Sequence, residues 1–376
     1  MSDFDYLMDV LENNFPFFGV VERRSGVDLR EAGQELRERL EDESIELNFR
    51  TFWNMLRDDF FAHSFPIGHM WMVTAYDRQS YLNDFRTFLP NDYEENHLWQ
   101  ILYPLPNYAG YAELLPDIRV LNWHWSQPSH NLNFDIIEEG QTAYIRVRTM
   151  ASMDESHREV VANFYEEISE FEHLIIDIRG NQGGWPYLFE EIVIEPLIRN
   201  NLTAQFHIFY KNGEHNRRFL ETLAISAASF DEYTLSRLFD GSNASEYLFD
   251  DLMMLDNRLT YTRTIRAVRP RASFNGKIWM LIDDGVLSGS QWVASFVKET
   301  GFATLVGETT GGVAAFPWSS NYFSLPNTGI VIRFDYTYAV TLDGMPLEEG
   351  TQPHYFNRPG MDALETVLAM IEEMHH

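Results

Sequence analysis

Residues 277–300, KIWMLIDDGVLSGSQWVASFVKET, decide the fold. The run KIWMLID at Lys277–Asp283 is mostly apolar, which is typical of a strand buried on both faces of a parallel sheet. Ser288–Thr300 follows a glycine turn and places its apolar residues at helical spacing. The stripe of this predicted helix consists of Trp292, Val293, Phe296 and Val297. A strand, a tight turn and a helix in succession indicate an α/β fold.

The same succession continues on both sides of this stretch. Four further strands are expected, at Ala143–Met150, Leu174–Ile178, Thr304–Gly307 and Ile330–Phe334. Three further helices are expected, at Glu155–Phe171, Tyr187–Ile198 and Asp362–Met374. The pattern predicts an α/β core over residues 136–376, interrupted by an acidic helical insertion at about 212–262.

The segment before this core has a different pattern. Apolar residues recur at helical spacing from the N-terminus to about residue 62, so residues 1–75 are expected to form a helical region. Residues 76–135 are rich in aromatic side chains, contain several prolines and show little periodicity. This composition indicates a connecting region of loops and short strands.

The composition excludes several classes of protein. The 376 residues carry 28 Lys and Arg against 57 Asp and Glu, a net charge of −29. A nucleic-acid-binding surface needs cations to displace counterions from phosphates, so no nucleic-acid partner is expected. Cysteine is absent, which excludes thiolate nucleophiles and disulfides. No run of about 18 apolar residues occurs, so no transmembrane segment is expected.

A glycine-rich turn follows the strand predicted at Leu174–Ile178. It lies in Asp177–Gly184, DIRGNQGG, and precedes a predicted helix. Paired glycines let the backbone turn sharply, and amides at a helix N-terminus stabilise negative charge. The functional interpretation is an oxyanion hole, and the alternative is a tight turn between strand and helix.

Ser288 occupies the corresponding position after the strand Lys277–Asp283. The carboxyl edge of the sheet is where α/β active sites form, and an exposed hydroxyl there can serve as a nucleophile. The amide of Gly289 can then face a developing oxyanion. The alternative is that Ser288 or Ser290 caps the helix, which is a common role of serine at this position.

Two more turns complete a set of four. They are Gly307–Gly312, GETTGG, and Asp343–Pro353, DGMPLEEGTQP. Each alone is ordinary, but the four together and in this order resemble the tail-specific, or C-terminal processing, serine peptidases and their relative, the tricorn core protease. The resemblance covers residues from about 136 to 376. It implies a crotonase-like (ClpP/crotonase) α/β core with a serine nucleophile.

The resemblance also implies roles for individual residues. Ser288 matches the nucleophile, with Ser290 as the fallback. The amide of Gly289 and that of Gly183 or Gly184 would form the oxyanion hole.

The next question is which residue serves as the general base, because a serine hydroxyl needs a neighbour that takes its proton. One branch of the family uses a lysine in the glycine turn, where this chain has Val313. The chain contains only three lysines, Lys211, Lys277 and Lys298. Lys298 lies nearly three turns beyond Ser288 on the same predicted helix, and the others lie in the insertion and before a strand. A Ser–Lys dyad is therefore not expected.

The tricorn-like branch uses a histidine from an earlier segment. Pro66–Met72, PIGHMWM, resembles that segment, which makes His69 the expected base. Histidine has a pKa suited to this role near neutral pH. The rival is His124, between Trp123 and Trp125, and the alternative for His69 is a buried histidine of the core.

The fourth turn supplies a glutamate in the tricorn-like branch. Glu348 is the first choice and Glu349 the second, with a solvated acidic turn as the alternative. Many members of the family place a PDZ domain between helices and core, but residues 76–135 are short and lack its carboxylate-binding loop, so none is expected. No histidine pair has metal-binding spacing, and neither a metal nor another cofactor is expected.

These observations predict a serine peptidase that acts on peptides or unfolded proteins through an acyl-enzyme at Ser288, with His69 as general base. One alternative is an inactive peptide-binding homologue, because Gln291 stands where the family usually has glutamate. Another is an esterase or other acyl hydrolase on the same site. The resemblance favours an extracytoplasmic or secreted protein whose signal has been removed over a cytoplasmic one, although the acidic N-terminus does not resemble a signal peptide.

Overall fold

The computed structural model describes residues 2–74, 128–151, 153–222, 226–240, 244, 246–268, 274–314 and 320–375. The chain divides into two compact units. Unit 1 comprises Met1–Leu121, Ile208–Leu259 and Pro317–Tyr338, and unit 2 comprises Asn122–His207, Thr260–Phe316 and Ala339–His376. Each unit is described by itself below.

Unit 2 is built on a six-stranded sheet with the order β13-β9-β8-β4-β3-β2. β2 pairs antiparallel with β3, and the remaining neighbours are parallel. The strands are β2 (Leu132–Glu138), β3 (Thr142–Val147), β4 (His173–Asp177), β8 (Lys277–Ile282), β9 (Thr304–Gly307) and β13 (Tyr355–Phe356). Every residue of β4 is buried, as its apolar sequence requires in the middle of a covered parallel sheet.

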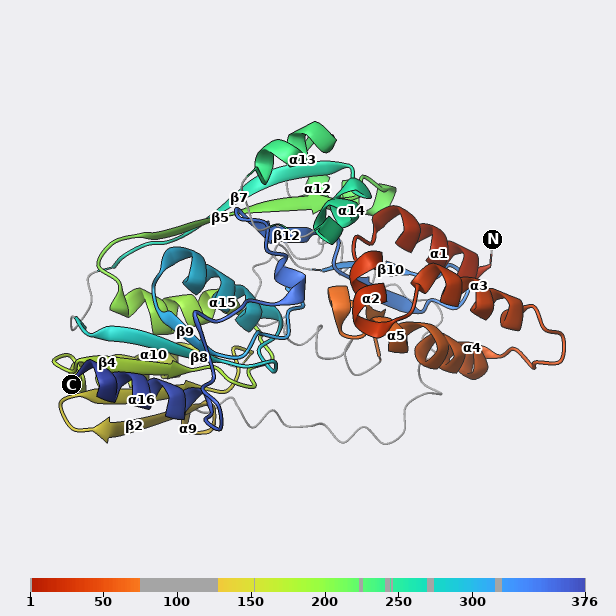
Figure 1. The fold of residues 1–376 in the computed structure, drawn as a ribbon. Coiled ribbons are helices and arrows are strands. Elements are labelled where there is room, and N and C mark those ends of the chain that lie inside the picture. Colours follow the sequence, from red (N-terminus) through yellow and green to blue (C-terminus); the bar gives the residue numbers. More distant parts are fainter. Residues whose placement is uncertain are drawn as a thin grey trace. The chain divides into compact units, whose positions relative to one another are not determined.

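Helices cover both faces of this sheet. In Figure 1, α15 (Ser288–Thr300) and α16 (Ala363–Met374) lie on opposite sides of β8 and β9. The buried cluster beneath α16 comprises Tyr144, Ile175, Trp279, Leu281, Val306, Ala363, Val367 and Ile371. The other helical elements of unit 2 are α9 (Pro128–Asn131), α10 (Glu155–Glu167), α11 (Pro186–Phe189), η5 (Glu190–Ile194), η6 (Glu195–Leu197) and η7 (Leu347–Glu349).

The sequence-based elements of unit 2 are largely confirmed. β3, β4, β8 and β9 match expected strands, α15 has the expected bounds, and the chain has a mixed α/β fold. The helix expected at Tyr187–Ile198 is instead a short α-helix followed by π and 3₁₀ turns. Pro186 lies in the first turn of α11, where its missing amide hydrogen is tolerated.

Unit 1 begins with the expected helices. They are α1 (Asp3–Asn14), α2 (Phe18–Ser25), α3 (Leu29–Leu40), α4 (Phe49–Leu56), η1 (Arg57–Phe61), α5 (Ala62–Ser64) and η2 (Ile67–His69). Side chains at Ser2, Asp28 and Asn48 cap three of these helices by accepting amide hydrogens of the first turn. The buried faces are rich in phenylalanine, including Phe15, Phe17, Phe60 and Phe61.

Unit 1 also contains segments from the expected core region. β1 (Trp71–Met72), β11 (Val331–Phe334) and β10 (Asn321–Ser324) form a three-stranded antiparallel sheet. The strand expected at Ile330–Phe334 is therefore present as β11, but it pairs with β1 of the N-terminal region and not with the six-stranded sheet. Residues 208–259 belong to unit 1 as well.

The insertion contains strands in addition to helices. Its elements are α12 (Glu214–Thr222), β6 (Ala228–Ser229), α13 (Glu232–Leu238), α14 (Glu246–Met253) and β7 (Asn257–Ile265). With β5 (Leu202–Tyr210) and β12 (Tyr338–Thr341), these strands form a sheet of order β12-β5-β7-β6. The insertion thus contains the expected helices, and β6 and β7 were not expected. Among the described helices, none has the length and apolar character needed to span a bilayer.

Candidate active site

Ser288 is the first residue of α15 and follows β8 through a short turn. Its φ is +55°, a left-handed conformation that residues other than glycine rarely adopt. The amide of Ser288 donates to the carbonyl oxygen of Gly312 at 3.2 Å, which fixes the turn. A strained serine between a strand and a helix presents its hydroxyl at the edge of the sheet.

The paired glycines of the 177–184 turn lie against this serine. A Cβ at Gly183 would lie 2.7 Å from the amide nitrogen of Gly289 and 2.9 Å from Cβ of Ser288. A Cβ at Gly289 would in turn lie 2.5 Å from the carbonyl oxygen of Gly184. Backbone contacts this close are possible only without side chains. The fold therefore brings Gly183, Gly184, Ser288 and Gly289 together, as the sequence analysis expected of neighbouring turns.

Asn181 holds the two turns in place. Its buried side chain donates to the carbonyl of Val147 at 3.0 Å and accepts from the amide of Gly183 at 2.9 Å. Its carbonyl oxygen accepts from the amide of Leu287 at 3.1 Å. The sequence analysis singled out the glycines of this turn and missed Asn181. The signal that marks it is an asparagine two residues before a glycine, a pattern typical of a side chain that accepts from the backbone.

The backbone amides of Gly183 and Gly184 differ in their hydrogen bonding. The amide of Gly183 is taken by Asn181, whereas no hydrogen bond of the Gly184 amide occurs within the described ranges. Gly184 has a φ of +125°, and a Cβ there would overlap the backbone of Ala151. Only glycine fits this position, and its amide is available to a ligand.

Ser290, the fallback residue, has a buried hydroxyl that is bonded to the backbone. Its Oγ accepts from the amide of Leu287 at 3.1 Å and contacts the carbonyl oxygens of Leu287 and Asn181. This is the geometry of a helix cap, which ties the start of α15 to the glycine turn.

Gln291 is fully buried and makes hydrogen bonds with both ends of its amide. Nε2 donates to the carbonyl of Leu347 at 2.9 Å and to Oγ1 of Thr351 at 3.0 Å. Oε1 accepts from the hydroxyl of Thr310. The amide thus links α15 to the third and fourth turns, and a glutamine is well accommodated at this position.

The two candidate glutamates lie in different surroundings. Glu348 is buried, and its Oε2 accepts from the amide of Ala314 at 3.1 Å, while its carbonyl accepts from Val313 at 3.2 Å. Glu349 is partly exposed. Val313 has a φ of +62°. Because Glu348 accepts from the amides of Val313 and Ala314, it holds the turn in which Gly312 accepts from the amide of Ser288.

His69 lies in unit 1 at the end of η2, and its side chain is buried. Gly68 and His69 have φ values of +57° and +41°, so this turn is strained. Nδ1 of His69 lies 2.6 Å from Oδ2 of Asp335, and the two side chains are 7% and 2% exposed. The amide of Asp335 also donates to the carbonyl of Gly68 at 2.6 Å. This pairing fixes the ring, with Nδ1 committed to the carboxylate.

Further groups support Asp335. Its Oδ1 accepts from the hydroxyl of Ser320 at 2.5 Å, and Nε of Arg333 donates to that hydroxyl at 2.8 Å. Burial by itself would raise the pKa of Asp335, but His69, Arg333 and Ser320 together hold the pKa below its ordinary value. Asp335 is therefore a buried carboxylate stabilised in its ionised form.

The sequence analysis also missed Asp335, the carboxylate that pairs with His69. Asp335 follows β11 directly, in Arg333-Phe334-Asp335, and an acidic residue at the end of an apolar strand is a signal that could have marked it. Two sequence-based expectations cannot be compared with the structure. His124 lies outside the described residues, as does most of the 76–135 region in which no PDZ domain is expected.

The fold and sequence can now be compared with known proteins. A model of peptidase family S41 matches residues 141–356. No curated protein matches the sequence. Among solved structures, a candidate peptidase from Parabacteroides merdae ATCC 43184 is similar with a TM-score of 0.58 at 15% identity, over 98% of this chain and 96% of that one. Mature CPAF is similar with a TM-score of 0.56 at 13% identity, over 99% of this chain and 95% of that one.

The match to the family model covers more than half of the chain, from before β3 to the end of β13. It includes all four turns that carry the Ser288, glycine and glutamate candidates. The protein therefore belongs to peptidase family S41.

Proposed function

We propose that the protein is a serine peptidase of the Ser–His type, acting on peptides or unfolded proteins. Ser288 attacks the scissile carbonyl, and Nε2 of His69 takes the serine proton and returns it to the leaving amine. Water then releases the acyl group from Ser288. Unit 2 would correspond to the crotonase-like core of the family.

The oxyanion would be held by the backbone amides of Gly289 and Gly184. Gly183 is the weaker candidate because its amide already donates to Asn181. Its role is instead to allow the close approach of the glycine turn to Ser288. Preorganised amides of this kind stabilise the negative charge that develops on the carbonyl oxygen.

Asp335 would orient His69 as a positioning residue. A carboxylate on Nδ1 fixes the tautomer that leaves Nε2 as proton acceptor, and it stabilises the imidazolium that forms. Glu348 would act by holding the turn that bonds the amide of Ser288. Its burial favours it over Glu349.

The conformation of Ser288 is the observation that supports the proposal most strongly. A serine at φ +55° packed against a double glycine has no evident value for stability, because Ser290 and not Ser288 caps α15 and the strain of Ser288 only costs free energy. Strain that persists in a well-packed turn is typical of a reactive group held in place.

The proposal is tested by labelling with a fluorophosphonate probe and by assay on an unfolded protein substrate. The wild-type protein is expected to be labelled at Ser288 and to cleave the substrate. Ser288→Ala and His69→Ala should each lower kcat at least about 10³-fold without loss of the folded state, as judged by circular dichroism. Full activity of Ser288→Ala would refute the proposal.

Gln291 motivates the second candidate, an inactive peptide-binding homologue. Its hydrogen bonds to Leu347, Thr351 and Thr310 give it a structural role, so the departure from glutamate does not by itself remove a catalytic group. Binding of peptides without labelling of Ser288 would favour this candidate. An acyl hydrolase is distinguished by turnover of esters without cleavage of peptides.

A further inference from the structure

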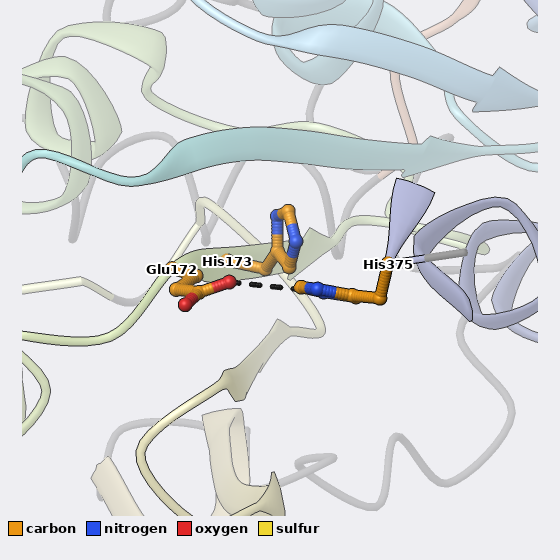
Figure 2. Close-up of side chains that lie close together, drawn as sticks. All are labelled: Glu172, His173 and His375. Carbon is orange, nitrogen blue, oxygen red and sulfur yellow. Dashed lines mark ion pairs between the residues drawn. The ribbon is translucent and has the colours of Figure 1, made fainter. Parts of the chain in front are cut away.

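Three potential metal ligands converge at the opposite end of the six-stranded sheet from Ser288. Figure 2 shows Glu172 and His173, at the start of β4, beside His375, which follows α16. One ligand atom from each residue lies within 4.8 Å of the other two. Because β4 and β8 are parallel and Ser288 follows the end of β8, this cluster lies at the other edge of the sheet.

The position of each group is fixed by the packing of unit 2. His173 is the first residue of β4 and is only 7% exposed. α16 packs on the same sheet through Val367 and Ile371, and the amide of His375 donates to the carbonyl of Glu372. The two chain segments, about two hundred residues apart, therefore meet without any contribution from the cluster itself.

The side chains of Glu172, His173 and His375 make few close contacts with polar groups of the described residues. Nδ1 of His173 is buried and has no hydrogen-bond partner within the described part of the chain. Nε2 of His375 and Oε2 of Glu172 are 3.7 Å apart, longer than a hydrogen bond. A buried polar atom without a partner is unusual and calls for an explanation.

We propose that Glu172, His173 and His375 bind a divalent transition metal, for which Zn²⁺ is the probe. Two imidazoles and a carboxylate form a donor set that suits Zn²⁺, with a fourth position for water. In a tetrahedral site, bonds of about 2.0–2.2 Å require ligand atoms roughly 3.3–3.6 Å apart. Glu172 and His375 are exposed side chains that can close the present separations by rotation.

The positive charge of Lys277 would repel a cation bound beside His173. Lys277 pairs with His173 in the register of β4 and β8. Its Nζ lies 3.9 Å from the centre of the Trp279 ring, so the ammonium is directed at that ring.

The bound metal would link the end of α16 to the start of β4. The expectation of no metal site was based on spacing in the sequence, which cannot detect ligands brought together by the fold.

The test is calorimetric titration of the full chain with Zn²⁺ after removal of metals by a chelator. One Zn²⁺ per chain is expected, and His375→Ala and Glu172→Gln should each weaken binding roughly tenfold or more. Glu172 and His375 are exposed, so these two variants should fold. His173 is buried, and His173→Ala is measured as well if that variant folds. Zn²⁺ should raise the Tm of the wild-type protein but not that of His375→Ala.

His376→Ala is the matched control, because adjacent terminal histidines can bind Zn²⁺ by themselves. Under the proposal it binds as tightly as the wild-type protein. If His376→Ala weakens binding as much as His375→Ala while Glu172→Gln has no effect, the proposal is wrong. It is also wrong if the wild-type chain does not bind Zn²⁺. Peptidase activity is not a readout, since the cluster lies away from Ser288.

Discussion

Nδ1 of His69 and Oδ2 of Asp335 lie 2.6 Å apart in a buried pair, although the two residues are separated by 266 positions in the sequence. The turn that carries His69 and the strand end that carries Asp335 are also joined by the bond from the Asp335 amide to Gly68. Ser320 and Arg333 complete the surroundings of the carboxylate. These residues, which all belong to unit 1, hold the imidazole in place.

Asp335→Asn should lower kcat by about 10² to 10⁴-fold with little change in KM. An amide can stabilise the wrong tautomer of His69 and cannot balance the imidazolium charge. The measurement is steady-state kinetics on a peptide substrate. A structural role alone would change stability without this split between kcat and KM. Asp58→Asn, at an exposed aspartate of the same unit, is the control and should have no effect.

The same carboxylate should contribute a pH-dependent part of the stability. The pKa of Asp335 is lowered in the folded state, so its contribution is present above the unfolded pKa of about 3.9 and is lost as the pH falls through the folded pKa. The free energies of unfolding of the wild-type protein and Asp335→Asn, measured in urea, should therefore differ at pH 5. The difference should shrink below about pH 4. A difference that does not depend on pH down to pH 3 would contradict the assignment.

The two serines at the start of α15 should respond in opposite ways to substitution by alanine. Ser288→Ala should abolish labelling by a fluorophosphonate. Ser290→Ala should keep the label at Ser288 but lose about 1–2 kcal/mol of stability, because the cap of α15 and its bond to the glycine turn are removed. Labelling of Ser290 in the Ser288→Ala protein would reverse the assignment.

The glycine turn provides a matched pair of variants. Gly180 and Gly183 both have positive φ values, but a Cβ at Gly180 meets nothing within 4 Å whereas one at Gly183 would press on Gly289 and Ser288. Gly180→Ala should lose only about 1 kcal/mol from strain and keep full labelling. Gly183→Ala should lose most of its labelling rate, because Ser288 and the oxyanion amides are displaced. Equal behaviour of the two variants would show that contact with Ser288 is unimportant.

Local patterns were sufficient for many of the strands and helices but not for the pairing of the strands. Buried strands such as β4 and β8 and the stripe of α15 are specified by residues adjacent in sequence. The strand at Val331–Phe334 was expected for the same reason, yet an apolar run does not specify which sheet it joins. β11 pairs with Trp71–Met72, which no local pattern could predict.

The same limit applies to the site. Ser288 and the glycines could be found because each lies in a strand–turn–helix unit with a recognisable sequence. Local signals mark Asp335 and Asn181 only as polar residues beside strand ends and turns, because their bonds to His69 and to Val147 form only in the folded chain. Glu348 is buried and Glu349 is partly exposed, a difference that the sequence of the turn does not reveal.

Gln291→Glu should destabilise the protein even though it introduces the residue that the family usually has. The carboxylate cannot donate to Leu347 and Thr351, and it would be buried as a charge without a basic partner among its bonded groups. The loss is expected to be about 2 kcal/mol at pH 8. Burial raises the folded pKa of such a glutamate above its unfolded value, so the penalty should be small near pH 4 and grow as the pH rises through the folded pKa. Urea unfolding at pH 5, 6, 7 and 8 measures this trend, with Gln291→Met as a control that removes the amide without adding a titratable group. A penalty that is the same at all four pH values would show that the carboxylate finds compensation in this turn.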